Sequence, residues 1–393
     1  MANTFLNPDQ ITTAALVVLH QKLNFAGSIN RSYDDSFARD GAKIGTQIRV
    51  RLPNQYVLRR GSAMVTQDVT EQSTSLVVAT QVGVDVNFSD IELTMNINDL
   101  TQTVIEPAMA VIASNIESDA LTMAKDVYNQ VNSHGSAQTF RNLLQAKKVL
   151  NDNLAPADDN RMLRINTQDT VDLADSLKGL FQQTTAIGKQ YTDGVMGKTG
   201  GFEMAENTLL NTYTRGAGNA AYIVNGAGQT GASLVVSTGA GAGNQGDVFT
   251  VAGVFRVHPE TKISTGVLQQ FVLTAAYAGG AGTMAISPAI ALTGGTQNVS
   301  SSPANAAVIT FAGTASATSN LSLAYHRDAF TFASADLIMP RGVHFASRKV
   351  LDGISMRLVQ AYDIANDRVP ARFDVLFGFK TIRPQLAVRI ATN

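Results

Sequence analysis

The most constraining feature of the sequence is an abrupt change of composition near residue 220. Between Ala220 and Ala317 only four residues are charged, and from Ile263 to His326 none is. The four are Asp247, Arg256, Glu260 and Lys262. Short apolar runs such as "DVFTVAGVFRV" and "LQQFVLTAAY" alternate there with turns of glycine, alanine, serine and asparagine. This pattern predicts an all-β barrel or sandwich, and its Val, Phe, Leu and Ile content argues against a disordered segment.

The flanking sequence predicts a mixed α+β domain that is interrupted by this segment. Apolar periodicity predicts helices near 140–150 and 169–181, and "RMLRIN" between them predicts a strand. After the low-charge segment the mixed pattern resumes and ends in the strand-rich "FDVLFGFKTIRPQLAVRI". We therefore expect the chain to leave one domain, build a second and return to the first.

A period-two pattern near the N-terminus predicts an extended hairpin. "IRVRL" and "VGVDVNF" both alternate apolar with polar residues, and the sequence between them is polar. We expect two long strands joined by an exposed tip that carries the charged residues Arg59, Arg60, Asp68 and Glu71. A solvated loop is one interpretation of this tip. The other is a contact with a neighbouring subunit.

Two helices are predicted around this hairpin. Apolar residues spaced by three and four from Ile105 to Val131 predict one helix of roughly 40 Å, at about 1.5 Å per residue. A short amphipathic arm helix is predicted to begin at Pro8 and Asp9. The N-terminal sequence lacks a basic leader, and its apolar stretch is shorter than the ~20 residues of a membrane span. We expect a soluble protein made in the cytoplasm, without a membrane partner.

The overall composition narrows the function. Only 16% of the 393 residues are charged, the net charge is −1 and cysteine is absent. A surface with so few charges favours extensive contact with other protein, since average domains carry about 25% charged residues. The balanced charge argues against a dedicated nucleic-acid binder. The lack of cysteine excludes disulfides and thiolate chemistry.

The stretch "YTDGVMGKTGG" contains a Gly-Lys-Thr at Gly197, Lys198 and Thr199. A phosphate-binding loop also needs a glycine five residues before Gly197, where Thr192 stands. A phosphate-binding loop lies between a buried strand and a helix. In this sequence polar residues precede the Gly-Lys-Thr, and "GGF" follows where the helix should begin. We therefore interpret this stretch as a turn.

Other possible motifs are equally weak. The two G-x-G-x-x-G matches, at 226–231 and 241–246, lie in turn-rich sequence without a following helix. The His326-Arg327-Asp328 triplet resembles the kinase triplet by letters only, since the companion motifs are missing. The pairs Asp158-Asp159 and Asp34-Asp35 lack the calcium-loop pattern. We expect no catalytic residues, metal or cofactor.

The order of the predicted segments resembles the major capsid (coat) proteins of tailed bacteriophages, which have the Hong Kong-97-like fold. The inserted β segment is similar to the extra β-barrel of certain short-tailed-phage coat proteins. Three stretches carry the resemblance, and they are "YTDGVMGKTGGFEM", "LAYHRDAFTFASADLIMP" and "FDVLFGFKTIRPQLAVRI". In such proteins the first is similar to a turn and strand before the insertion, the second to the re-entry and the third to the C-terminal strands.

The resemblance implies an α+β chain with a defined set of segments. They are an N-terminal arm at 1–44, an extended hairpin loop at 45–90, a peripheral domain with a spine helix at 91–135, an axial domain beginning at 136–219, an inserted β-barrel at 220–317 and axial and peripheral parts at 318–393.

The resemblance also implies a function. The chain would self-assemble into pentamers and hexamers of an icosahedral head, around a scaffolding protein and a portal, and would enclose double-stranded DNA without sequence specificity. It would assemble in the host cytoplasm and reside in the virion. A β-rich surface adhesion or fibre protein is the alternative, favoured by the Gly/Ala/Ser-rich β segment. An enzyme with a degenerate nucleotide site is a third.

Overall fold

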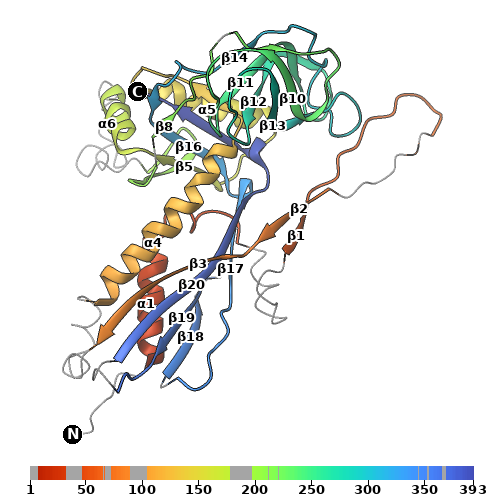
Figure 1. The fold of residues 1–393 in the computed structure, drawn as a ribbon. Helices are drawn as coiled ribbons and strands as arrows, with labels where there is room; N and C mark the ends of the chain where they lie inside the picture. Colours follow the sequence, from red (N-terminus) through yellow and green to blue (C-terminus); the bar gives the residue numbers. More distant parts are fainter. Residues whose placement is uncertain are drawn as a thin grey trace. The chain divides into compact units, whose positions relative to one another are not determined.

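The computed structural model describes eleven stretches of the chain, numbered 8–31, 47–64, 66, 72–88, 104–177, 197–210, 212–219, 221–343, 345–351, 354–364 and 369–393. Figure 1 shows the fold. The chain divides into two compact units. The first unit comprises Met1–Val50, Ser73–Leu121 and Phe330–Lys380, and the second comprises Arg51–Gln72, Thr122–Ala329 and Thr381–Asn393.

The first unit packs two helices with an antiparallel sheet. Helix α1 (Pro8–Lys22) contacts helix α4 (Glu106–Leu121) and strand β18. The sheet has the order β17 (Phe330–Ala335), β20 (Val369–Thr381), β19 (Ile354–Gln360) and β18 (Phe345–Leu351), and β3 (Thr80–Phe88) also pairs with β20. The core residues Leu16 and Leu19 of α1 and Met109, Ile112 and Ile116 of α4 are buried. The apolar faces of the two helices thus supply much of this unit's core.

A buried carboxylate holds the segment that follows α1. Glu117 of α4 is 2% exposed and accepts hydrogen bonds from the backbone N–H groups of Phe25 (2.7 Å) and Ala26 (3.4 Å). The ring of Phe25 packs edge-on against Phe330, with 5.5 Å between the centroids. A buried carboxylate needs such donors because desolvation of an unpaired charge is costly.

The predicted long helix is shorter than expected. Helix α4 ends at Leu121 and continues as a 3₁₀ turn, η3 (Thr122–Asp126), and strand β4 (Gln130–Asn132), so the predicted helical end at Val131 is wrong. The apolar spacing in the sequence continues beyond the end of the helix, and its residues Met123, Val127 and Val131 are all buried. The backbone there bonds to the C-terminal strand instead, as the Arg389 N–H donates to the Asn129 carbonyl at 2.9 Å.

The predicted hairpin also pairs differently. Strand β1 (Gln47–Arg51) pairs with β2 (Ser73–Val77), while β3, which contains "VGVDVNF", pairs antiparallel with β20. The predicted pairing of the first strand with "VGVDVNF" is therefore wrong. The alternation itself is confirmed, since Val82, Val84 and Val86 are more buried than their neighbours. A two-residue period identifies the buried face of a strand but does not identify the strand with which it pairs.

The second unit contains a mixed sheet with helices α5 (Phe140–Asp152) and α6 (Thr167–Leu177). The strand order is β4, β21 (Ala387–Ala391), β16 (Leu321–His326), β5 (Arg161–Ile165), β7 (Phe202–Glu206) and β6 (Lys198–Thr199). Helix α5 packs against β21 through a face that includes the buried Leu143, Ala146 and Leu150. The predicted helix at 140–150 and strand at 161–166 are confirmed. The predicted helix at 169–181 begins two residues earlier, and 178–181 lie outside the described residues.

The low-charge segment folds into a nearly closed six-stranded sheet, so the all-β prediction is confirmed. Its strand order is β14 (Ile309–Phe311), β11 (Val248–Val257), β12 (Ser264–Leu273), β13 (Gly282–Ile290), β10 (Gly231–Thr238) and β9 (Ile223–Val224). The outer strands approach each other, because the Ile309 N–H donates to the Tyr222 carbonyl at 3.0 Å. The core includes Phe249, Phe271 and Phe311.

The chain enters and leaves this sheet side by side. Strand β8 (Tyr213–Thr214) pairs antiparallel with β15 (Thr318–Ser319). The domain boundaries predicted at 220 and 317 lie close to this pair and stay a prediction. None of the helices in the described parts is long and apolar enough to cross a membrane.

Candidate functional site

The predicted contact residues lie in the loop between β1 and β2. Arg59 and Arg60 are both exposed. The Arg59 guanidinium donates to the carbonyls of Gly61 and Ala63 in its own loop. Arg60 makes no hydrogen bond or ion pair with a described residue. Asp68 and Glu71 lie outside the described residues, so the predicted contact of these four side chains stays a prediction.

The same loop exposes apolar side chains that sequence reasoning missed. Tyr56 is 59% exposed, Leu58 77% and Met64 82%. In the sequence they stand in two short apolar runs, Tyr56-Val57-Leu58 and Ala63-Met64-Val65, inside an otherwise polar stretch. Large apolar side chains that share an exposed loop are typical of a surface that contacts another protein.

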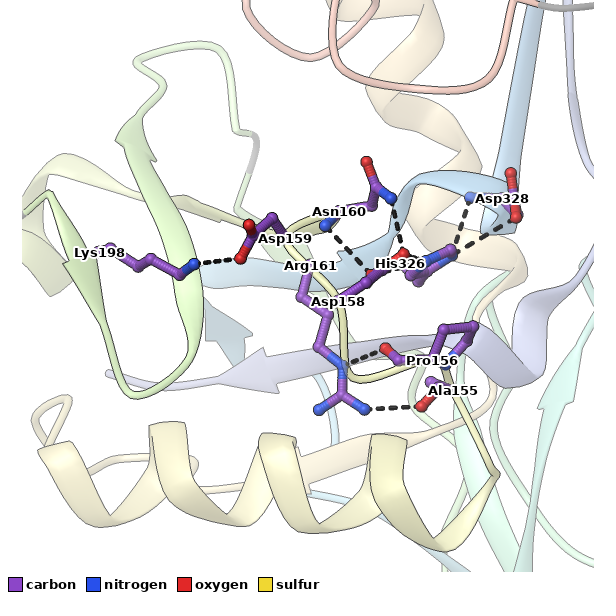
Figure 2. A network of polar contacts seen from close by, with 9 residues as sticks. All are labelled: Ala155, Pro156, Asp158, Asp159, Asn160, Arg161, Lys198, His326 and Asp328. Carbon is purple, nitrogen blue, oxygen red and sulfur yellow. Dashed lines mark hydrogen bonds and ion pairs between the residues drawn. The ribbon is translucent and has the colours of Figure 1, made fainter.

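The Gly-Lys-Thr stretch forms a tight β-hairpin, which confirms the predicted turn. Lys198 and Thr199 of β6 pair with Glu203 and Phe202 of β7. The two residues between the strands, Gly200 and Gly201, have φ values of 63° and 88°. Two positive φ angles in a two-residue hairpin loop define a type I′ turn, which favours glycine. No helix follows the motif, and the Lys198 ammonium pairs with Asp159 (Figure 2).

His326, the last residue of β16, joins two loops of the second unit. It is 3% exposed, and its Nδ1 accepts the backbone N–H of Asp328 at 3.2 Å. Nε2 lies 3.1 Å from Oδ1 of Asp158, so in neutral imidazole this nitrogen carries the proton and donates it (Figure 2). The histidine of the His-Arg-Asp triplet therefore has a structural role, since it bonds to the loop at Asp158 and to the backbone of Asp328.

The loop around Asp158 is held by further polar contacts. Partial desolvation opposes ionisation of Asp158, but hydrogen bonds from Asn160 and His326 prevail and lower the pKa of its carboxyl. Arg161 donates to the carbonyls of Pro156 and Ala155, each at 2.7 Å (Figure 2). Within the described residues, no three His, Asp or Glu side chains are grouped to hold a metal ion. This network can stabilise a surface loop and has no arrangement that would activate a nucleophile.

A buried polar cluster connects the low-charge segment to the mixed sheet. Asp247, immediately before β11, accepts hydrogen bonds from the Tyr213 hydroxyl (2.6 Å) and from the backbone N–H groups of Gly216 (3.1 Å) and Asn244 (2.8 Å). Arg389 of β21 is fully buried and donates to the Gly246 carbonyl at 2.8 Å. Its guanidinium lies 5.7 Å from the centre of the Tyr213 ring. Burial lowers the pKa of Arg389 to about 10 and raises that of Tyr213.

Two further contacts join the same parts. The Gln270 side chain of β12 bonds to both the backbone N–H (2.8 Å) and the carbonyl (3.0 Å) of Gln130 in β4. Arg256 of β11 pairs with Asp152 of α5 at 3.0 Å. Two of the four charged residues in the low-charge segment, Asp247 and Arg256, therefore help to attach it to the rest of the second unit. Their isolation in an almost uncharged segment was the only sequence signal for this role.

Comparison with solved structures finds chains from bacteriophages. A chain of Mycobacterium phage Che8 is 11% identical, with a TM-score of 0.49, covering 94% of this chain and 90% of that one. A capsid chain of Cyanophage P-SCSP1u is 11% identical, with a TM-score of 0.44, covering 90% and 84%. The CUS-3 coat protein I-domain is 26% identical, with a TM-score of 0.19, covering 23% of this chain and 94% of that one. No curated protein sequence matches the chain significantly.

The described residues define a mixed α/β subunit with exposed apolar side chains on one loop and no grouped metal ligands. A family model described as "P22 coat protein - gene protein 5" matches residues 19–390. The chain belongs to this family. It is a major capsid protein of a tailed phage, a structural component of the virion that forms an icosahedral shell. The predicted resemblance is thereby confirmed.

Proposed function

We propose that copies of this chain form the pentamers and hexamers of the phage head, which encloses double-stranded DNA. Assembly takes place in the host cytoplasm around a scaffolding protein and a portal, and DNA contacts the inner face without sequence specificity. The observation that carries the proposal is the family match from residue 19 to 390, which covers nearly the whole chain. The balanced net charge of −1 supports DNA contact that is not based on a dedicated basic surface.

The proposal assigns roles to the segments. The stretch 220–317 is the inserted β-barrel domain of a Hong Kong-97-like subunit, and the nearly closed sheet with its own aromatic core supports this. Residues 45–90 form the extended loop, whose exposed Tyr56, Leu58 and Met64 favour contact with another subunit. Arg59, Arg60, Asp68 and Glu71 contribute charged contacts there. Many modest interfaces, repeated by symmetry, would then close the shell.

Electron microscopy of the purified chain tests the proposal. Expressed with its scaffolding protein, the chain should give closed isometric particles, and single-particle averages should show five-fold and six-fold clusters. Filaments or bundles would instead support the adhesion or fibre alternative, which the family match does not favour. Particles from the wild-type chain also provide the reference for variants of the β1–β2 loop.

A further inference from the structure

A cavity of about 440 Å³ lies within the second unit. Its walls come from the base of the β1–β2 loop, the end of α5, the low-charge segment and the residues after β20. Three cationic residues line it, namely Arg256, Lys262 and Arg383, and the lining contains no aspartate or glutamate. The volume falls within the range of small-ligand pockets, which is roughly 300–1,000 Å³.

Several hydrogen-bond donors on residues of this lining lack a partner among the described residues. Arg256 uses one terminal nitrogen for Asp152 (3.0 Å) and the other for the Asn153 side chain (3.4 Å). Its Nε is buried and unpaired among the described residues, and so is Nδ2 of Asn153. Tyr128 is 8% exposed, and its hydroxyl bonds to no described residue. The Arg256 Nε and the Asn153 Nδ2 have almost no accessible surface, so a ligand in the cavity would meet the Tyr128 hydroxyl and the cationic side chains instead.

The two other cations have no carboxylate partner within the described chain. Lys262 donates to the carbonyls of Gly295 (2.6 Å) and Gln297 (3.3 Å), which leaves one of its three N–H donors. Burial lowers the pKa of Lys262, as expected for an ammonium that lacks a counter-ion. The Arg383 guanidinium makes no ion pair with a described residue. Asp152 compensates Arg256, so two positive charges of the lining remain unbalanced.

We propose that this cavity binds a carboxylate, and that in the shell an acidic side chain from a second copy of the chain supplies it. A carboxylate accepts several charge-assisted hydrogen bonds at once and matches the remaining Lys262 donor and the Arg383 guanidinium. The phosphates of duplex DNA are unsuitable, because the double helix is far too wide to enter a cavity of this size. The identity of the second copy as the source rests on the proposed function, whereas the carboxylate site itself does not.

Calorimetric titration of the unassembled subunit with glutarate tests the site independently of assembly. The wild-type subunit should bind glutarate saturably and more tightly than inorganic phosphate. Lys262→Gln and Arg383→Gln should each weaken binding by about tenfold or more, since each removes a charge-assisted bond. Arg141→Gln, on the exposed face of α5, is the matched control and should bind as the wild type does.

Thermal unfolding of each variant separates a lost ligand contact from a lost fold. Arg383 is the more informative position, because its side chain makes no polar contact with the described residues that folding could require. The proposal is overturned if the wild type fails to bind glutarate, if phosphate binds more tightly, or if folded Arg383→Gln binds like the wild type.

A second measurement identifies the source of the carboxylate. Assembled particles are treated with a carbodiimide, which joins an amine to an adjacent carboxylate, and cross-linked peptides are mapped by mass spectrometry. A link between Lys262 and an acidic residue of another copy supports the second copy as the source. Particles that lack this link and still bind glutarate overturn the second copy as the source and leave the carboxylate site supported.

Discussion

Tyr213 donates a 2.6 Å hydrogen bond to Asp247 across the junction between the mixed sheet and the nearly closed sheet. Tyr213 lies on the strand that leads into the low-charge segment, and Asp247 is that segment's only acidic residue besides Glu260. Asp247 is 1% exposed and has three donors around it, so this single carboxylate organises the attachment of the sheet.

Asp247→Ala should destabilise the unassembled subunit by roughly 2–4 kcal/mol. It removes the buried acceptor of three donors and a negative charge that acts on the buried Arg389. Tyr213→Phe removes one hydrogen bond and should cost about 1 kcal/mol. Urea unfolding measures both, with Tyr56→Phe in the exposed loop as the control. Equal stability of Asp247→Ala and the control would contradict this role.

The stability of the subunit should decrease as the pH falls below about 6.5, in part through His134. Its side chain contacts Ser319 at 2.7 Å and Gln130 at 2.9 Å. Burial lowers the pKa of His134 below its usual value of 6.5, and the positive charges of Arg389 and Arg215 lower it further. The unfolded chain therefore binds the proton more readily, and stability declines from pH 6.5 down through the folded pKa.

His134→Gln should flatten this part of the pH profile. Unfolding free energies at pH 7.5, 6.5 and 5.5 measure the effect. An unchanged slope in His134→Gln would show that other groups account for the acid sensitivity.

The Gly-Lys-Thr hairpin should depend on its glycine and not on its lysine. A Cβ at Gly200 would lie 2.9 Å from Leu143 Cδ2, and the φ of 63° disfavours any side chain. Gly200→Ala should therefore cost about 1–2 kcal/mol. Lys198→Ala removes only an exposed ion pair and should leave stability and particle assembly unchanged. Neither protein should bind ATP or GTP. Micromolar nucleotide binding that Lys198→Ala abolishes would refute the turn.

Charge reversal of Arg59 and Arg60 together should reduce particle assembly far more than subunit stability. Both side chains are exposed, and exposed ion pairs contribute only about 0–1 kcal/mol each to folding. The same change recurs in every copy of a shell, so its effect on assembly accumulates. Particle yield by sedimentation and the melting temperature of the free subunit measure the two effects. If the double variant lowered the melting temperature of the free subunit as strongly as it lowered particle yield, the two arginines would have a role in folding.

The types of most elements could be predicted from the sequence because they depend on local periodicity. The alternation of Val82, Val84 and Val86 identified a strand and its buried face, and the near absence of charge from Ile263 to His326 identified an all-β segment. The two glycines of the hairpin at Gly200 identified a turn. Each of these features is expressed over a few residues.

Partners and boundaries were decided only by the tertiary structure. β3 pairs with β20, almost three hundred residues away in the chain, and α4 stops at Leu121, before the segment Gln130–Asn132 that pairs with β21. The spacing of Met123 and Val127 is compatible with an α-helix, whereas the backbone there forms a 3₁₀ turn and the Val127 N–H donates to the Ala124 carbonyl at 3.3 Å. The role of Asp247 could not be predicted from the sequence either. Its donors are Tyr213, Gly216 and Asn244, and only the fold brings Tyr213 and Gly216 close to it. Local pattern therefore determined what each segment is, and long-range hydrogen bonding determined what it contacts.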